Sequence, residues 1–237
     1  MTAAADAHTL VLLRHGHTPW NLTDRFTGWT DIALTAVGIG QAEQAGRALA
    51  RQGLGFDEVH VSRLRRTRQA ALALLAAAGT PQVPVRATWR LNERHYGALQ
   101  GMNKQEIFAV WGEERSRAWW RGYEVPPPSL TWEDPRHPRF DSRYADLDLE
   151  SLPAAESLRD CQQRMLPYWH GVLVPRLLAG RRLLVLSHGN TLRGLVMHLE
   201  GLTPQAMEKV EIPSGVPLVY RLTADLAIVG KAWLEIG

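Results

Sequence analysis

The sequence predicts an α/β fold, a three-layer α/β/α sandwich around a mostly parallel central sheet. Two continuous apolar runs, at residues 10–13 and 183–186, are typical of strands that are buried on both faces. Strand-like and helix-like segments alternate along the rest of the chain, which is the pattern of a parallel sheet covered by helices. Because 45% of the 237 residues are hydrophobic, the chain can bury a sizeable core, and we expect a single domain over residues 1–237.

The first half of the chain gives the elements in order. A strand is expected over residues 8–14, followed by a helix that begins after Thr35, a favoured N-cap residue, and ends near Gly53. The alternation continues with strand-like, helical, strand-like and helical segments at residues 58–62, 64–78, 83–88 and 103–122. The last of these helices is expected to break near Gly112.

Periodicity fails between residues 124 and 153, where six of the 14 prolines occur. Long irregular segments inside compact domains are usually lids over a site or linkers between domains. Helical segments flank this one on both sides, which favours a lid segment at about 124–155. An interdomain linker is the alternative.

The second half of the chain resumes the alternation. A helix is expected over residues 156–179, bent or interrupted at Pro167 and Pro175. A buried strand, a helix, and a Thr-Pro helix start follow at residues 182–187, 191–199 and 203–204. Strand-like runs at 218–222 and 226–233 complete the pattern.

Composition excludes several classes of protein. Cys161 is the single cysteine, so neither an intramolecular disulfide nor a Cys-rich zinc site can form, which suits the cytoplasm. Residues 1–6 have no basic segment followed by an apolar one, and no run of about 18 apolar residues occurs, so we expect neither export nor a membrane span.

The positive charge is carried almost entirely by arginine. The net charge is only +3, and lysine occurs at three positions, so 24 of the 27 cations are arginine. Arginine suits phosphate and carboxylate groups, whereas nucleic-acid binding usually goes with a larger cationic excess. A small anionic ligand is therefore one interpretation, and a coding bias toward arginine is the other.

Two histidines follow the two buried strands. Each strand is followed by a polar residue, a histidine and a glycine, at Arg14-His15-Gly16 and at Ser187-His188-Gly189. Ligands of open α/β sheets bind beyond the carboxyl ends of the strands, so adjacent parallel strands would bring both imidazoles together. A helix that starts near Asn190 would direct its positive end to the same place. The pattern predicts a phosphate pocket that contains an imidazole.

An imidazole with one free ring nitrogen can attack phosphorus, and nearby cations then stabilise the transferring phosphoryl group. His15 and His188 could share these two tasks. Structural histidines and a zinc site are the alternatives, but no H-x-x-x-H or similar pair supplies further ligands nearby.

The motifs around these histidines resemble the histidine phosphatase superfamily, which has the phosphoglycerate mutase-like fold. Within it, they are similar to the 2,3-bisphosphoglycerate-dependent phosphoglycerate mutases. The matching segments are residues 14–21, 26–29, 91–101, 103–104, 123–128, 156–158, 167–169 and 212–220. The segment 91–101, Leu-Asn-Glu-Arg-His-Tyr-Gly-Ala-Leu-Gln-Gly, is the most specific of them.

The resemblance implies a role for each matching residue. His15 would be the phosphorylated nucleophile, and Glu93 would be the general acid and base. The residues expected around the phosphoryl group are Arg14, Arg66, His188, Asn21, Gly189 and Asn190. The residues expected to bind the rest of the substrate are Thr18, Thr27, Gly28, Arg94, His95, Tyr96, Lys104 and Arg121. Taken singly, several have plain structural interpretations; Arg66, for example, lies in a charge run that usually forms a solvated helix face.

The sequence departs from the mutase pattern at four places. Trp120 stands where these mutases usually have a ligand-contacting arginine, His17 where they have glutamate or glutamine, and Glu211 where they have asparagine. The chain also ends soon after its last predicted strand, without the longer tail of many mutases. The Trp120 difference in particular predicts weaker binding of the ligand's second anionic group.

The resemblance implies interconversion of 3-phosphoglycerate and 2-phosphoglycerate, a reaction of glycolysis and gluconeogenesis. The expected substrate is a small phosphorylated carboxylic acid, the primer is 2,3-bisphosphoglycerate, and no metal is required. We expect a cytoplasmic protein, a homodimer or homotetramer, with no nucleic-acid or membrane partner. A histidine phosphatase that hydrolyses small phosphomonoesters or 2,3-bisphosphoglycerate is the nearest alternative, and a non-catalytic phosphate-binding domain is another.

Overall fold

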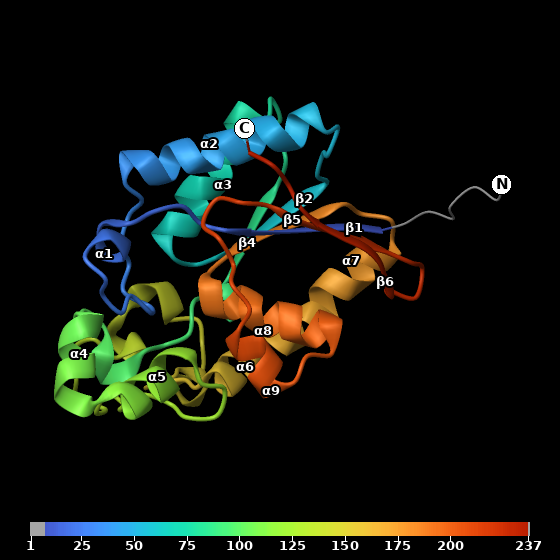
Figure 1. Cartoon of the computed structure of the whole chain (residues 1–237). Helices are drawn as coiled ribbons and strands as arrows, with labels where there is room; N and C mark the ends of the chain where they lie inside the picture. Colours follow the sequence, from blue (N-terminus) through green and yellow to red (C-terminus); the bar gives the residue numbers. More distant parts are fainter. Residues whose placement is uncertain (1–7, 237) are drawn as a thin grey trace.

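The computed structural model describes residues 8–236, and a six-stranded sheet in the order β3-β2-β4-β1-β5-β6 lies at its centre (Figure 1). The strands are β1 (His8–Arg14), β2 (Glu58–Ser62), β3 (Val85–Thr88), β4 (Leu183–Ser187), β5 (Leu218–Leu222) and β6 (Ile228–Trp233). The first four run parallel, whereas β5 and β6 are antiparallel to their neighbours. The predicted mostly parallel sheet is confirmed. The expectation about residues 1–6 lies outside the described residues.

Helices cover both faces of this sheet, as the three-layer prediction requires. Figure 1 shows α2 and α3 on one face and α6, α7 and α8 on the other. The helices are α1 (Pro19–Leu22), α2 (Ala36–Arg51), α3 (Arg65–Ala77), α4 (Lys104–Trp111), α5 (Glu113–Arg121), α6 (Leu158–Tyr168), α7 (Val174–Leu178), α8 (Gly189–Glu200) and α9 (Pro204–Glu208). Among residues 8–236, no helix is long and apolar enough to cross a lipid bilayer.

The apolar side chains of the central strands divide between two cores. Along β1, Leu10 and Leu12 pack with the layer of α6 to α8, whereas Val11 and Leu13 pack with α2 and α3. All four are at most 1% exposed. This alternation follows from the period of two in a strand, and it explains why the run is apolar at every position.

Local signals fix several element boundaries where the sequence predicts them. Thr35 caps α2 by accepting a hydrogen bond from the Gly38 amide, and Gly112 separates α4 from α5 with a φ of 78°. The helix with two prolines is interrupted by a π-helical turn, Trp169–Leu173, between α6 and α7. Helix α8 begins at Gly189, two residues earlier than expected, because the His188 carbonyl already accepts from the Leu192 amide.

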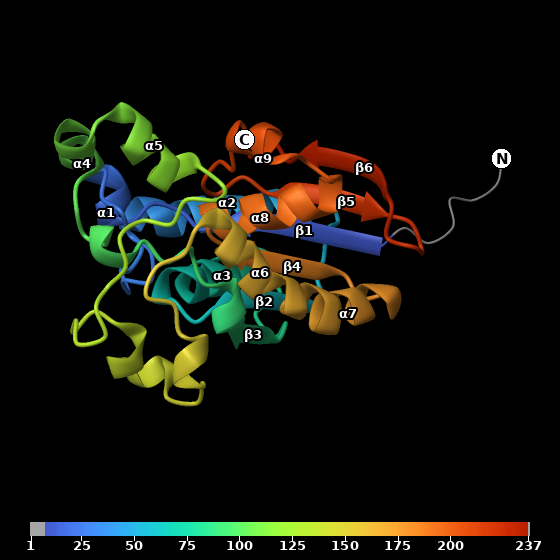
Figure 2. The same cartoon turned by 90° about the horizontal axis from the view of Figure 1, so that it is seen from below.

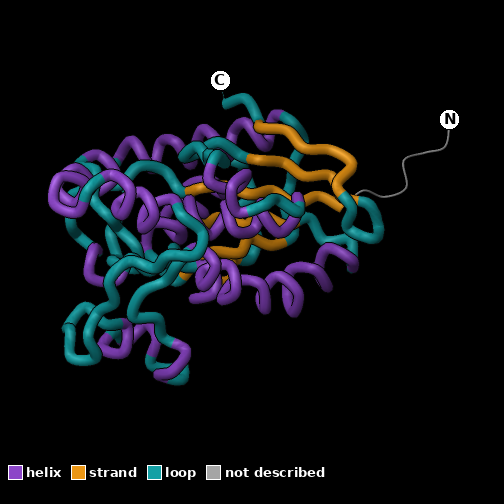
Figure 3. Tube along the Cα trace, turned by 60° about the horizontal axis from the view of Figure 1, so that its bottom comes forward, coloured by secondary structure: helices purple, strands orange, loops and turns teal. Residues whose placement is uncertain are grey.

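The proline-rich segment at 124–155 contains only short 3₁₀ turns, at Pro138–Phe140, Ser142–Tyr144 and Leu149–Ser151. Figures 2 and 3 show that its middle part extends from the carboxyl-end side of the sheet, apart from α4 and α5. Tyr144 and Leu152 bury their side chains against Trp29. The segment is therefore irregular but packed.

A buried histidine lies in the sheet away from the predicted site. His60 of β2 has no exposed surface, and its Nδ1 atom is 2.8 Å from the Tyr168 hydroxyl. Burial lowers the pKa of His60 from 6.5 to about 4, although the nearby Glu58 carboxylate acts in the opposite direction. The folded protein therefore holds this imidazole neutral at neutral pH.

We predict that His60 makes the protein less stable in acid. As the pH falls through 6.5, the unfolded chain binds a proton that the folded chain excludes until the pH nears 4. The free energy of unfolding should lose about 1.4 kcal/mol per pH unit in this window from His60 alone. His60→Gln should flatten the slope by that amount in urea titrations between pH 6 and 4.5, with His170→Gln at an exposed position as the matched control. An unchanged slope in the His60 variant would contradict the assignment.

Candidate active site

Parallel pairing of β1 and β4 brings the two strand-end histidines together. Arg14 lies opposite Ser187 in the ladder, and the His15 amide continues it by donating to the Ser187 carbonyl at 3.1 Å. The ring centroids of His15 and His188 are 4.9 Å apart. The two motifs that look alike in the sequence therefore form one site at the carboxyl edge of the sheet.

The hydrogen bonds of His15 define its tautomer. Its Nδ1 atom lies 2.7 Å from the Gly16 carbonyl oxygen, which can only accept, so Nδ1 carries the proton and Nε2 keeps its lone pair. Burial, followed by the Arg66 and Arg14 charges, lowers the pKa of His15 well below 6.5. The ring is therefore neutral at physiological pH, which is the form that a nitrogen nucleophile requires.

Arg66 joins the two imidazoles. It lies in the first turn of α3, is 1% exposed, and its Nε atom is 3.2 Å from both His15 Nε2 and His188 Nδ1. Its terminal nitrogens donate to the Gly28 and Thr30 carbonyls at 2.8 and 2.9 Å. Burial lowers the pKa of Arg66 to about 10, so the group stays charged at neutral pH. The charge run around Arg66 is thus not a solvated face at this position.

His188 is fully buried and does not line the cavity that the other groups of the site surround. Because Arg66 donates to Nδ1 of His188, the proton of this ring is on Nε2, which donates to the Ser62 hydroxyl at 2.8 Å. Burial, together with the charge of Arg66, lowers the pKa of His188 well below 6.5. This second neutral imidazole fixes the orientation of Arg66.

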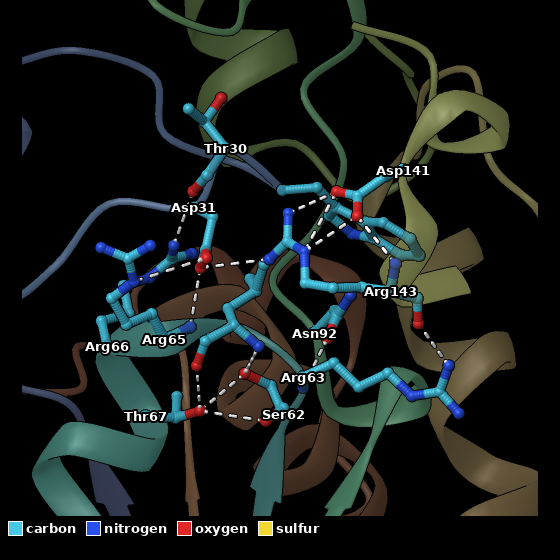
Figure 4. Close-up of polar contacts among 12 residues, drawn as sticks. Thr30, Asp31, Ser62, Arg63, Arg65, Arg66, Thr67, Asn92, Asp141 and Arg143 are labelled. Atoms are coloured by element: carbon cyan, nitrogen blue, oxygen red, sulfur yellow. Dashed lines mark hydrogen bonds and ion pairs between the residues drawn. The ribbon is translucent and has the colours of Figure 1, made fainter. Parts of the chain in front are cut away.

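A polar network supports the loop at residues 28–31, whose Gly28 and Thr30 carbonyls accept from Arg66 (Figure 4). Asp31, next to Thr30, accepts from the Arg65 amide at 2.7 Å and pairs with Arg143 at 3.1 Å. Arg143 is also paired with Asp141 in the irregular segment. The segment at 124–155 therefore contacts the loop at residues 28–31 through the ion pair between Arg143 and Asp31.

Glu93 is placed in the cavity by hydrogen bonds to its side chain and its backbone. Its Oε1 atom accepts from the amides of Arg94 and Asn190 at 2.9 and 3.1 Å. The buried Arg164 donates to the Asn92 and Glu93 carbonyls, both at 3.1 Å, and forms an ion pair with Glu156. Since both amide bonds use Oε1, the other carboxylate oxygen can exchange a proton with a ligand.

These groups surround a cavity of about 160 Å³. Its wall contains six cationic side chains and two carboxylates. The cations are Arg14, Arg25, Arg66, Lys104, Arg121 and Arg193, and the carboxylates are Glu93 and Glu211. A small ligand with more than one anionic group suits this lining.

Most of the residues singled out in the sequence line this cavity. They are Arg14, His15, Asn21, Thr27, Gly28, Arg66, Glu93, Tyr96, Lys104, Arg121, Gly189 and Asn190. Thr18, Arg94 and His95, like His188, are fully buried outside the lining. Thr18 caps α1, Arg94 stacks on the Tyr96 ring at 4.5 Å, and His95 accepts from the Gly97 amide. In this structure these three side chains support the wall from behind.

Sequence reasoning missed four lining residues, Arg25, Phe26, Arg193 and Ile212. Arg193 is 3% exposed and donates to the Asn190 side chain and the Met207 carbonyl, each at 3.1 Å. Burial lowers its pKa to about 10, so it too remains charged. Because Arg193 is three residues beyond Asn190, both lie on one face of α8, and this spacing is the signal that could have revealed it.

No residue of the described segment 124–155 lines this first cavity. Seven of its residues instead border a second cavity, of about 430 Å³, beside Trp29, Thr30 and Asp31. Closure of this segment over the ligand stays a prediction. Within residues 8–236, no three His, Cys, Asp or Glu side chains are grouped as a metal site would require.

Comparisons with known proteins agree with this architecture. The model of the histidine phosphatase superfamily, branch 1, matches residues 10–143 and 129–225. A 2,3-bisphosphoglycerate-dependent phosphoglycerate mutase from Nitratidesulfovibrio vulgaris is 51% identical over 227 residues, which cover 96% of this chain and 91% of that protein.

Solved structures share the fold at lower identity. A mycobacterial glucosyl-3-phosphoglycerate phosphatase has a TM-score of 0.68 at 25% identity, covering 90% of this chain and 92% of its own. The α-ribazole phosphatase from Shigella flexneri has a TM-score of 0.71 at 21% identity, covering 97% of both chains. The chain therefore belongs to the histidine phosphatase superfamily, and within it to the 2,3-bisphosphoglycerate-dependent phosphoglycerate mutases.

Proposed function

We propose that this protein interconverts 3-phosphoglycerate and 2-phosphoglycerate in glycolysis and gluconeogenesis, through a phosphohistidine and 2,3-bisphosphoglycerate. The observation that carries the proposal is the neutral His15 ring, whose unprotonated Nε2 atom lies beside Arg66 in a cavity that also holds Glu93. The relative from Nitratidesulfovibrio vulgaris, a mutase by name, supports this reaction rather than another of the superfamily.

The reaction begins with the phosphoryl group on Nε2 of His15. A hydroxyl oxygen of the monophosphate attacks the phosphorus, the P–N bond breaks, and the hydroxyl proton passes to Glu93. The products are 2,3-bisphosphoglycerate and the neutral His15 ring. Arg14 and Arg66 stabilise the charge on the phosphoryl oxygens during transfer.

The second half of the reaction reverses these steps at the other oxygen. The bisphosphate turns within the cavity and presents its other phosphoryl group to His15 Nε2. As that P–O bond breaks, Glu93 returns its proton to the leaving oxygen, so the phosphohistidine is restored. The bisphosphate primes the enzyme because it supplies the first phosphoryl group.

The substrate's carboxylate and phosphate suit the cations of the cavity wall, so no metal is needed for charge balance. We further propose a single domain with a lid segment at about 124–155, a cytoplasmic location, and a homodimer or homotetramer. Crosslinking and light scattering of the purified protein test the last of these.

Hydrolysis of the phosphohistidine by water is the competing activity. Trp120 lines the cavity where these mutases usually carry a cation, and this difference would weaken binding of the bisphosphate. A coupled assay with 3-phosphoglycerate, with and without added 2,3-bisphosphoglycerate, separates the two. A mutase gives 2-phosphoglycerate at a rate that rises with primer, whereas a phosphatase gives inorganic phosphate.

We predict that His15→Ala abolishes phosphotransfer and the acid-labile phosphoenzyme, because no other group can form the covalent intermediate. Brief incubation with 2,3-bisphosphoglycerate and phosphopeptide mapping should place the label on His15. His17→Ala is the matched control, since His17 is the nearest other imidazole in the sequence. Label on His17 or on a serine would refute the assignment, provided circular dichroism shows both variants folded.

Glu93→Gln should lower mutase turnover by about 10²- to 10⁴-fold, since the amide cannot carry the proton. Glutamine keeps an oxygen that can accept from the Arg94 and Asn190 amides, so binding of inorganic phosphate should survive. Steady-state rates and calorimetric phosphate binding measure the two effects. Unchanged turnover would remove Glu93 from the mechanism.

Trp120→Arg should tighten binding of the bisphosphate, because it restores a cation beside the ligand. A charge-assisted hydrogen bond contributes about 1.5–3 kcal/mol, so the half-saturating primer concentration should fall about ten- to hundredfold. Trp120→Leu, which removes the ring without adding charge, is the control. If Trp120→Arg leaves that concentration unmoved or raises it, Arg121 or Arg193 already supplies the missing charge.

A further inference from the structure

One of the two carboxylates in the cavity wall has no part in the mechanism above. Glu211 lies between α9 and β5, 90 residues beyond Arg121, and the two side chains form an ion pair. Both residues line the cavity that holds His15. Glu93, the other carboxylate, is bound by backbone amides instead. Glu211 therefore neutralises Arg121, and both partners of this ion pair belong to the cavity wall.

The backbone holds Glu211 at this place. The carbonyl of the next residue, Ile212, accepts from Arg14 at 3.0 Å. The Gly215 amide donates to the Arg14 carbonyl at 2.9 Å. The segment that carries Glu211 is thus tied to the arginine that precedes the nucleophile, so the carboxylate stays beside the cavity even though its side chain is 68% exposed.

Arg121 differs from the other cations of the wall. Arg14, Arg25, Arg66 and Arg193 donate to backbone carbonyls, which orient a guanidinium without cancelling its charge. Lys104 pairs with Asp24, which does not line the cavity. Arg121 also lies against the Trp120 ring, 5.3 Å from its centroid, and that face offers it no anionic partner. An anionic ligand must therefore compete with Glu211 for Arg121.

We propose that Glu211 is a specificity-determining residue that competes with the ligand's second anionic group for Arg121. The inference rests on the proposed function, since 3-phosphoglycerate and the bisphosphate carry two anionic ends. Glu211 lowers the affinity for such ligands and leaves binding of a single phosphate, held by Arg14 and Arg66, unaffected. It thereby adjusts how firmly the cavity holds the end of the ligand that is not reacting.

The test compares two probes on unphosphorylated protein by calorimetry, 3-phosphoglycerate and inorganic phosphate. Glu211→Gln keeps the size of the side chain and removes its charge. An exposed ion pair contributes modestly, so the Kd for 3-phosphoglycerate should fall about two- to fivefold, while the Kd for inorganic phosphate stays unchanged. The gain should shrink as salt is raised from 50 to 500 mM, because screening weakens exposed pairs.

Two controls separate local competition from a general effect of charge. Glu113→Gln makes the same charge change at an exposed carboxylate of α5 that pairs with Arg117 and does not line the cavity. It should change neither Kd. In an Arg121→Leu background, Glu211→Gln should no longer tighten 3-phosphoglycerate, because the cation for which it competes is gone.

The outcomes distinguish the two proposals. An unchanged Kd for 3-phosphoglycerate, equal tightening of both probes, or an equal gain from Glu113→Gln overturns the role of Glu211 and leaves the mutase assignment intact. If wild-type protein binds inorganic phosphate but not 3-phosphoglycerate, the proposed function fails and the role of Glu211 fails with it.

Discussion

The candidate site depends on one buried guanidinium, that of Arg66, which directs the same N–H toward two imidazoles. Its Nε atom lies 3.2 Å from acceptor nitrogens of both His15 and His188, so neither of these nitrogens can be protonated without facing a buried positive charge. The carbonyls of Gly28 and Thr30 satisfy its other nitrogens. Burial is the first cause of the lowered pKa of His15, and Arg66 adds to it by placing a fixed positive charge beside the proposed nucleophile.

This interaction is available because of the sheet topology. Parallel strands β1 and β4 end in register, so the residues that follow them, His15 and His188, are neighbours although they are 173 positions apart in the chain. Helix α3 follows β2, which pairs with the other side of β4, and its first turn brings Arg66 to the same edge. The continuous apolar runs bury β1 and β4 within the sheet, and the sheet determines which polar residues meet.

The sequence was informative where a pattern had a geometric consequence. Paired strand-end histidines predicted one shared pocket, and apolar periodicity predicted the layers around it. Arg66 could be assigned only through the family resemblance, because a basic run at a helix start normally faces solvent. Motif membership also does not reveal which side chains reach the ligand: Thr18, Arg94 and His95 stand in ligand-associated motifs, yet they are fully buried and do not line the cavity. The spacing of Arg193 from Asn190 places both on one face of α8, but the contact of Arg193 with the Met207 carbonyl depends on how α8 and α9 pack.

The cations of the cavity are held in two different ways. The difference suits a ligand that must rotate in the cavity between two phosphoryl transfers. Those bound to carbonyls keep their full charge for the ligand, as Arg14 and Arg66 do beside the nucleophile. Lys104 and Arg121 instead pair with carboxylates whose side chains are 48% and 68% exposed. Exposed pairs are weak and exchange readily with another anion. In the proposed mechanism the phosphoryl group in transfer lies beside the fixed charges of Arg14 and Arg66, whereas Lys104 and Arg121 offer the remainder of the ligand charges that it can bind and release. A cavity with fixed, uncompensated charge at both ends would bind the bisphosphate tightly in one orientation and oppose the rotation that the reaction needs.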